Sequence, residues 1–185
     1  MHPQRIQQIT EALFNNSASV IKRGILKYVT LEELLTLSLH PDERTAFRAA
    51  WALEHVLQAD GSKDLLSQYS SILKIYNQSH NWSVLRSISK LIMLILKDRK
   101  TLDSMPESYV ENILNTTFRI LEDQYCPVAV RCNTYDILYA FVTLHPWIAH
   151  ELRQIMQLDL EKNEMPALKS RAKKVMQRLE RIAKT

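Results

Sequence analysis

Residues 47–57 constrain the fold of this 185-residue chain more than any other segment. The segment is predicted to be one helix, in which the small side chains of Ala49, Ala50 and Ala52 allow neighbouring helices to approach closely. Weaker copies of it recur roughly every 40 residues, a period typical of chains built from repeated helix pairs. Because each repeat in such an array packs only on its neighbours, the array offers a surface rather than a catalytic centre.

Glycine and proline usage favours an all-helical chain. Only 2 residues are Gly, whereas turn-rich β proteins and phosphate-binding loops need Gly for its positive φ angles. The 6 Pro residues each precede or open an apolar periodic segment. Pro is tolerated there, since the amides of the first helical turn have no partner to lose. We therefore predict an all-α fold.

Apolar residues at helical spacing predict about ten helices in antiparallel pairs. They form a single helical-repeat domain over residues 1–185, in which residues 1–29 make N-terminal capping helices. The helix-pair repeats are expected at residues 30–59, 62–97, 106–144 and 146–183. Thr30 and Glu33 have the spacing of a capping box at the start of the first repeat. The last helix carries a single apolar stripe, as a terminal helix with nothing stacked beyond it requires.

Four local expectations follow from the same patterns. Residues 17–28 are predicted to form one helix, with Val20, Ile21, Ile25 and Tyr28 on one stripe. Asp60-Gly61-Ser62 predicts a turn, and residues 65–76 beyond it a single helix. Residues 98–104 are expected to be a polar, charged connection.

An arginine falls early in the second helix of each predicted pair. The motif around it is clearest at Phe47-Arg48-Ala49-Ala50-Trp51-Ala52-Leu53, weaker at Leu85-Arg86-Ser87-Ile88 and Val130-Arg131-Cys132-Asn133, and weakest at Ser170-Arg171-Ala172. The motif resembles that of HEAT-type repeat proteins, whose second helix carries an apolar residue and Arg before an Ala-rich stretch with a late Leu. The best copy resembles uncharacterised bacterial HEAT-like proteins, although Glu54 stands where the family usually has Gly. The resemblance implies a right-handed α-α superhelix of the ARM/HEAT type.

The repeated arginines have two interpretations. They are either structural, forming salt bridges between repeats, or they form a ladder of cations along a binding groove. The resemblance favours the structural interpretation, because HEAT-type arginines usually hold repeats together.

Positive charge is concentrated in two blocks, although the net charge is only +4. In the first block, Arg86, Lys90 and Lys97 share one face of a predicted helix. In the second, the final helix carries Lys169, Arg171, Lys173, Lys174, Arg178, Arg181 and Lys184. These blocks are either a surface that binds the phosphate groups of a nucleic acid or simply solvated helix faces. Four aromatic residues, which are either core residues or platforms for base stacking, are Trp51, Trp82, Tyr135 and Trp147.

Enzymatic chemistry has little support in the sequence. Nucleophile motifs and Gly-rich phosphate loops are absent, and His40 and His145 each precede Pro at an expected helix start, where turn or capping roles fit best. Cys126 and Cys132 lie six apart on one predicted helix, so their side chains are expected on different faces and form neither a disulfide nor a metal pair. We expect no catalytic, cofactor-binding or metal-binding residues.

The expected location is the cytoplasm of a prokaryote. Thiols without a disulfide partner are typical of a reducing compartment. The N-terminus has no apolar targeting segment, and the longest apolar run, residues 91–96, is far shorter than the roughly 20 residues of a membrane span.

Three functional hypotheses result. The first is a non-enzymatic scaffold that binds a protein or peptide on the second helices. The second is a nucleic-acid-binding protein similar to the HEAT-like DNA alkylation-repair proteins, and the third is a catalytic HEAT-like protein that uses Asp136 or Glu54 in a cleft beside an aromatic ring. The candidate binding surface comprises Arg48, Arg86, Lys90, Lys97, Arg131, Tyr135, Arg171, Lys173, Lys174 and Arg178.

Overall fold

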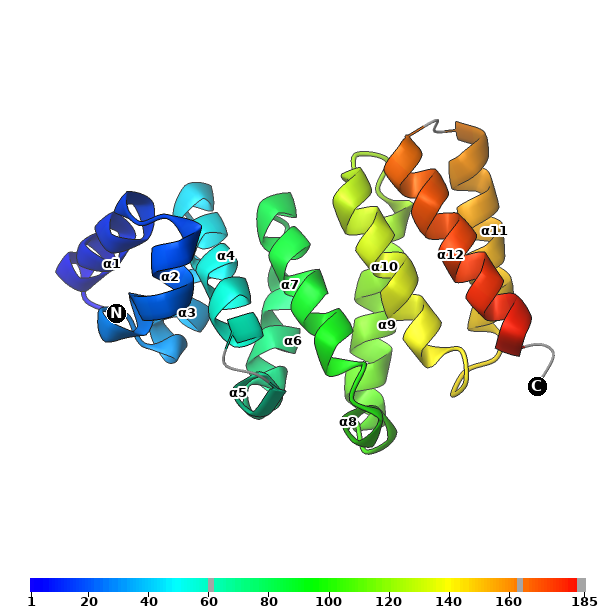
Figure 1. The fold of residues 1–185 in the computed structure, drawn as a ribbon, viewed down its shortest axis with the longest axis horizontal. Helices are drawn as coiled ribbons and strands as arrows, with labels where there is room; N and C mark the ends of the chain where they lie inside the picture. Colours follow the sequence, from blue (N-terminus) through cyan, green and yellow to red (C-terminus); the bar gives the residue numbers. More distant parts are fainter. Residues whose placement is uncertain (60–61, 163–164, 183–185) are drawn as a thin grey trace. The chain divides into compact units, whose positions relative to one another are not determined.

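The computed structural model describes residues 1–59, 62–162 and 165–182, and over these ranges the protein is all-helical, with no β-strand (Figure 1). The predicted all-α fold is therefore confirmed. The chain divides into two compact units, Met1–Ile95 and Leu96–Thr185. We describe each unit by itself, and the single helical-repeat domain stays a prediction. The turn expected at Asp60-Gly61-Ser62 falls largely on residues 60 and 61, which lie outside the described ranges.

The first unit is organised around one long helix, α4. Its elements are α1 (Pro3–Asn15), α2 (Ala18–Gly24), the 3-10 helix η1 (Ile25–Lys27), α3 (Leu31–Leu37), α4 (Glu43–Ala59), α5 (Ser62–Ser67), α6 (Tyr69–Gln78) and α7 (Trp82–Ile95). Helix α4 contacts α1, α2, α3, α5 and α7, and Figure 1 shows it between α2 and α7. Ala49, Ala50 and Ala52 are fully buried in these contacts, so the small residues do permit close packing.

The predicted capping box opens α3 and is reinforced by α1. The Glu33 amide donates to the Thr30 hydroxyl at 3.1 Å, and the Thr30 amide donates to the Glu33 carboxylate at 2.9 Å. Arg5 of α1 donates to both carboxylate oxygens of Glu33, at 2.7 and 2.8 Å. These contacts, with that of the Arg5 guanidinium the strongest, lower the pKa of Glu33 to about 2.

Two expectations for the first unit were wrong in detail. Helix α2 ends at Gly24 and continues as η1, so Tyr28 leaves the predicted stripe and is exposed. Val20 lies within α2 but is exposed as well, because it is about 100° round the helix from the buried Ile21. A mid-helix Gly weakens the helix it interrupts, which explains the early end of α2. Residues 65–76 belong to two helices, α5 and α6, that are separated at Gln68.

The second unit is organised around α10. Its elements are α8 (Arg99–Asp103), α9 (Glu107–Glu122), α10 (Val128–Phe141), α11 (Ile148–Lys162) and α12 (Pro166–Ile182). Helix α10 contacts α9, α11 and α12 (Figure 1). The predicted stripe of the last helix is confirmed, because Leu168, Ala172, Val175 and Leu179 are all buried.

Two details of the second unit, at residues 98–104 and at the start of α10, differ from the expectations. The connection at residues 98–104 contains a short helix, α8. The Asp98 carboxylate caps it by accepting from the Thr101 amide at 3.0 Å, and Leu102 is buried. Asp98 at the N-cap position, followed by Leu102, is a sequence signal for a short helix. Helix α10 begins after Cys126, so the two cysteines do not share a helix, and both are free thiols. Burial raises the pKa of Cys126 to about 11.

We expect Glu33→Gln to lower the free energy of unfolding at pH 7 by about 1 kcal/mol, the usual value of a helix cap. Because the pKa of Glu33 is lowered from 4.5 to about 2 in the folded protein, its contribution is fully present above pH 4.5 and is lost as the pH falls towards 2. Thermal unfolding followed by circular dichroism across this window tests the expectation. The control is Glu32→Gln, which changes an exposed carboxylate of the same turn. Equal pH slopes for the two variants would contradict the role of Glu33.

Candidate functional site

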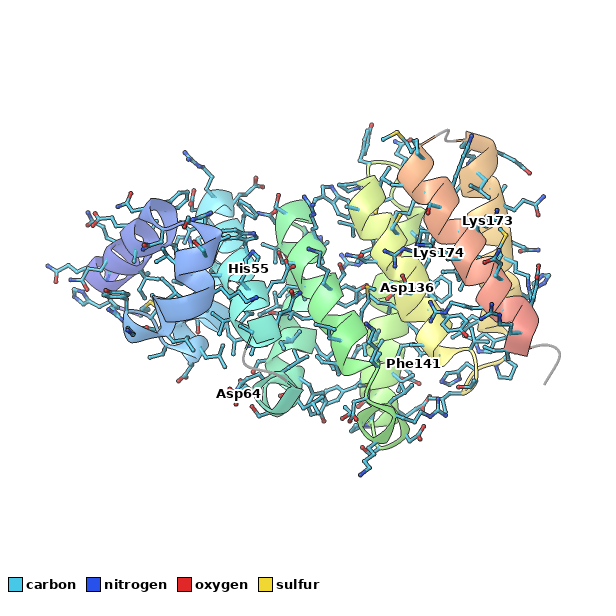
Figure 2. All side chains as sticks on the ribbon, in the orientation of Figure 1. His55, Asp64, Asp136, Phe141, Lys173 and Lys174 are labelled. Carbon is cyan, nitrogen blue, oxygen red and sulfur yellow. The ribbon has the colours of Figure 1, made fainter. Side chains whose placement is uncertain are left out.

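Cationic and aromatic side chains alternate along the exposed face of α4. Arg44 lies over the Phe14 ring, with its Cζ atom 5.3 Å from the ring centroid, and Arg48 lies over the same ring at 5.6 Å. Arg48 also lies over Trp51 at 4.5 Å. Trp51 meets His55 edge to face, with ring centroids 4.6 Å apart. We call this set, Phe14, Arg44, Arg48, Trp51 and His55, the Arg–aromatic ladder; Figure 2 labels His55 on α4.

Arg48 is held firmly within the ladder because it also closes the end of α1. Its guanidinium donates to the carbonyl oxygens of Leu13 and Asn16, the latter at 3.0 Å. The last carbonyls of a helix have no partners within it, so these bonds satisfy groups that α1 leaves open. Arg48 is thus a structural residue, as the resemblance implied, but its partners are carbonyl groups rather than an acidic side chain.

Arg131 has the same function in the second unit. It donates to the carbonyl oxygen of Leu121 at the end of α9, at 3.1 Å, and pairs with Asp159 of α11 at 3.4 Å. Tyr135 donates its hydroxyl proton to the same Asp159 carboxylate. Burial, together with Asp159, raises the pKa of the Tyr135 hydroxyl, so it stays protonated. We call this set of residues the Asp159 network.

The expectation that Tyr135 belongs to a binding surface was wrong. Its side chain has no exposed area and lies in the core of the second unit. The alternative interpretation of Tyr135, as a core residue, is the correct one, and α11 supplies Asp159 as the partner for its hydroxyl. Buried tyrosines usually find such a partner.

Glu54 and Lys90 form an ion pair between α4 and α7. The Lys90 ammonium lies 2.7 Å from the Glu54 carboxylate, which is almost fully buried. Glu54, which departs from the family motif, therefore has a structural role, and it holds one of the candidate cations. Arg86 on α7 is exposed. Lys97 is exposed as well, but it follows α7 and falls in the second unit.

Two arginines of α12 converge on one carboxylate of α10. Arg171 and Arg178 each donate to a different oxygen of Asp136, the second at 2.7 Å. The Cζ atom of Arg178 also lies 3.7 Å from the Tyr139 ring centroid. We call Asp136, Tyr139, Arg171 and Arg178 the arginine clasp. Figure 2 shows Asp136 between α10 and α12, with Lys174 nearby on α12 and Lys173 on the other side of that helix.

The remaining candidate aromatics differ in exposure. Trp82 is half-buried at the start of α7. Trp147 is exposed and stacks on Phe118, with ring centroids 5.9 Å apart. His40 accepts from the Asp42 amide at 3.1 Å, which confirms its role in a turn.

The surface also has two shallow clefts, neither of which gathers catalytic groups. One, of about 530 Å³, lies between α3 and α6 and is lined by Glu32, Leu35, Thr36, Leu39, Gln68, Ser71, Lys74 and Ile75. The other, of about 500 Å³, is lined by Leu160, Lys169, Lys173, Met176, Gln177 and Glu180. In the described part of the chain, no three His, Cys, Asp or Glu residues are grouped to hold a metal ion. No helix there is long and apolar enough to cross a membrane.

Comparison of the chain with protein-family models, with curated proteins and with solved structures found no match.

Most of the ladder was not predicted, although part of its signal is present in the sequence. Arg44, Arg48, Trp51 and His55 follow one another at i, i+4, i+7 and i+11, the spacing of one helix face. The place of Phe14 could not be predicted, because it depends on how the end of α1 packs against α4.

We expect Tyr135→Phe to lower the free energy of unfolding by about 1–3 kcal/mol, because it leaves the buried Asp159 carboxylate without one of its donors. Urea unfolding followed by circular dichroism measures the change. Tyr125→Phe is the matched control, since Tyr125 is largely exposed and should tolerate loss of its hydroxyl. Similar stabilities for the two variants would mean that the Tyr135 hydroxyl contributes nothing to the Asp159 network.

Proposed function

We propose that this protein is a non-enzymatic scaffold that binds a segment of a partner protein on the Arg–aromatic ladder of α4. The observation that supports this most directly is the ladder itself, in which two arginines of α4 contact rings of α1 and α4 on a surface that remains partly open to solvent. Aromatic residues and arginine are the types most enriched at the centres of protein interfaces.

The ladder is also pre-organised. Arg48 is fixed by the helix-end carbonyls that it binds, and its guanidinium in turn positions the rings of Phe14 and Trp51. Side chains that are already ordered lose little conformational entropy when a partner binds. The exposed Arg44 adds a positive charge to the ladder, so a partner segment with acidic and aromatic residues fits best.

We further propose that the chain is a HEAT-like right-handed superhelix with antiparallel helix pairs. Supporting this, Arg48 and Arg131 make the same kind of bond, each to the carbonyl end of another helix. Likewise, Lys90 on α7 pairs with Glu54 on α4, and Arg171 on α12 pairs with Asp136 on α10. The free thiols fit the proposed location in a bacterial cytoplasm.

A second candidate function is nucleic-acid binding through α12. That helix has six basic residues and one acidic residue, and Lys169, Lys173 and Lys174 are exposed. The candidate is weaker than the first because Arg171 and Arg178 are paired with Asp136, and Arg131 and Tyr135 are directed into the Asp159 network.

The test is a selection of unphosphorylated random peptides on the immobilised full-length chain, followed by fluorescence anisotropy with the recovered peptides. We expect acidic peptides with aromatic residues, and we expect Arg44→Ala to weaken their binding about tenfold or more, because it removes an exposed member of the ladder. Lys27→Ala is the matched control, since it removes an exposed positive charge elsewhere in the same unit.

Equal binding to the Arg44→Ala and Lys27→Ala variants would overturn the proposed site. If no peptide is recovered while short duplex or single-stranded nucleic acids bind with a steep salt dependence, the second candidate function replaces the first.

A further inference from the structure

The arginine clasp leaves most of its hydrogen-bond donors open. Each guanidinium has five N–H groups, and each donates one hydrogen bond to Asp136. The side chains of Arg171 and Arg178 remain 37% and 44% exposed, whereas that of Asp136 is 12% exposed. The carboxylate is thus nearly enclosed, while both arginine side chains are partly exposed to solvent.

The clasp is also fixed in position. Asp136 brings the two guanidinium groups together by accepting one bond from each, and the Tyr139 ring supports Arg178 at 3.7 Å. Stacking and pairing of this kind restrict a long side chain before any ligand arrives, so less entropy is lost on binding.

Lys174 adds a third cation on the same face of α12. Residues 171, 174 and 178 are spaced i, i+3 and i+7, so their side chains project from one face of the helix. Three positively charged side chains therefore project from the face of α12 that carries both partners of Asp136. Lys173 is directed elsewhere, because it lines the cleft with Leu160 and Met176.

We propose that Arg171, Lys174 and Arg178 bind a phosphate monoester on a phosphorylated segment of a partner protein. Planar guanidinium groups match the geometry of phosphate oxygens, and the excess of cations suits a dianion better than a single carboxylate. A phosphoserine fits this site better than a nucleic acid does, since the two arginines converge on one carboxylate instead of following a strip. The neighbouring lysines, Lys169 and Lys173, lie on a different face beside Glu180.

The test compares a degenerate peptide library that carries one fixed phosphoserine with its unphosphorylated counterpart, by fluorescence anisotropy on the full-length chain. We expect the phosphorylated library to bind about tenfold more tightly, and inorganic phosphate to compete with it. Lys174→Ala should remove most of this difference, whereas Lys173→Ala, the same change on the neighbouring face, should preserve it. Lys174 is exposed, so its loss leaves the fold intact.

A second variant separates geometry from charge. Arg178→Lys keeps the positive charge but loses the planar fork and its support on Tyr139, so it should also lose most of the preference for phosphate. Full binding by this variant would overturn the proposed geometry.

Three other results would overturn the proposal. They are equal binding of the two libraries, equal losses for the Lys173→Ala and Lys174→Ala variants, and tighter binding of a short single-stranded DNA that depends on both lysines. The inference goes beyond the proposed function and does not depend on it. The α4 ladder is tested with unphosphorylated peptides. Any binding of the library to the ladder is common to the phosphorylated and unphosphorylated libraries, so it does not contribute to the difference between them.

Discussion

The open carbonyl groups at helix ends are the constraint on which both units depend. A chain of short helices has many such ends, and each end that packs against another helix needs a donor for its last carbonyls. Arg48 supplies these donors to α1, and Arg131 supplies them to α9. Arginine suits this task because its fork can bond two acceptors at once and remains charged at all relevant pH values. The helix that carries the arginine is thereby fixed to the helix that it closes.

Partly buried carboxylates organise the remaining cations. Glu33 forms an ion pair with Arg5, and Glu54 forms one with Lys90. Asp136 pairs with both Arg171 and Arg178. In each case the acidic group is less exposed than its basic partner, so the carboxylate is the fixed point and the cation reaches it from the surface. These pairs neutralise part of the positive charge of a chain that has 24 basic residues and a net charge of +4. The cations in these pairs hold helices together.

The sequence predicted helix positions well because those depend on local patterns. The apolar spacing predicted the helix over residues 47–57, which lies within α4, and the stripe of α12, and the Thr30–Glu33 capping box was correct in atomic detail. The errors arose where local signals compete, as at Gly24, or where a short polar segment forms a helix of one turn, as at α8. The partners of Arg48, Tyr135 and Asp136 could not be predicted. Each contact joins residues more than 20 positions apart, and its geometry depends on helix packing rather than on sequence spacing.

The two proposed surfaces differ in how many hydrogen bonds and ring contacts their arginines already make within the protein. The N–H groups of Arg48 donate to carbonyl oxygens, and its planar guanidinium lies over the rings of Phe14 and Trp51. The ladder can therefore offer a partner stacking and apolar contact but few hydrogen-bond donors. Arg178 has one face on Tyr139 and one bond to Asp136, so its edge remains available for an anion. The same residue type therefore favours an aromatic, acidic peptide in one unit and a phosphate group in the other.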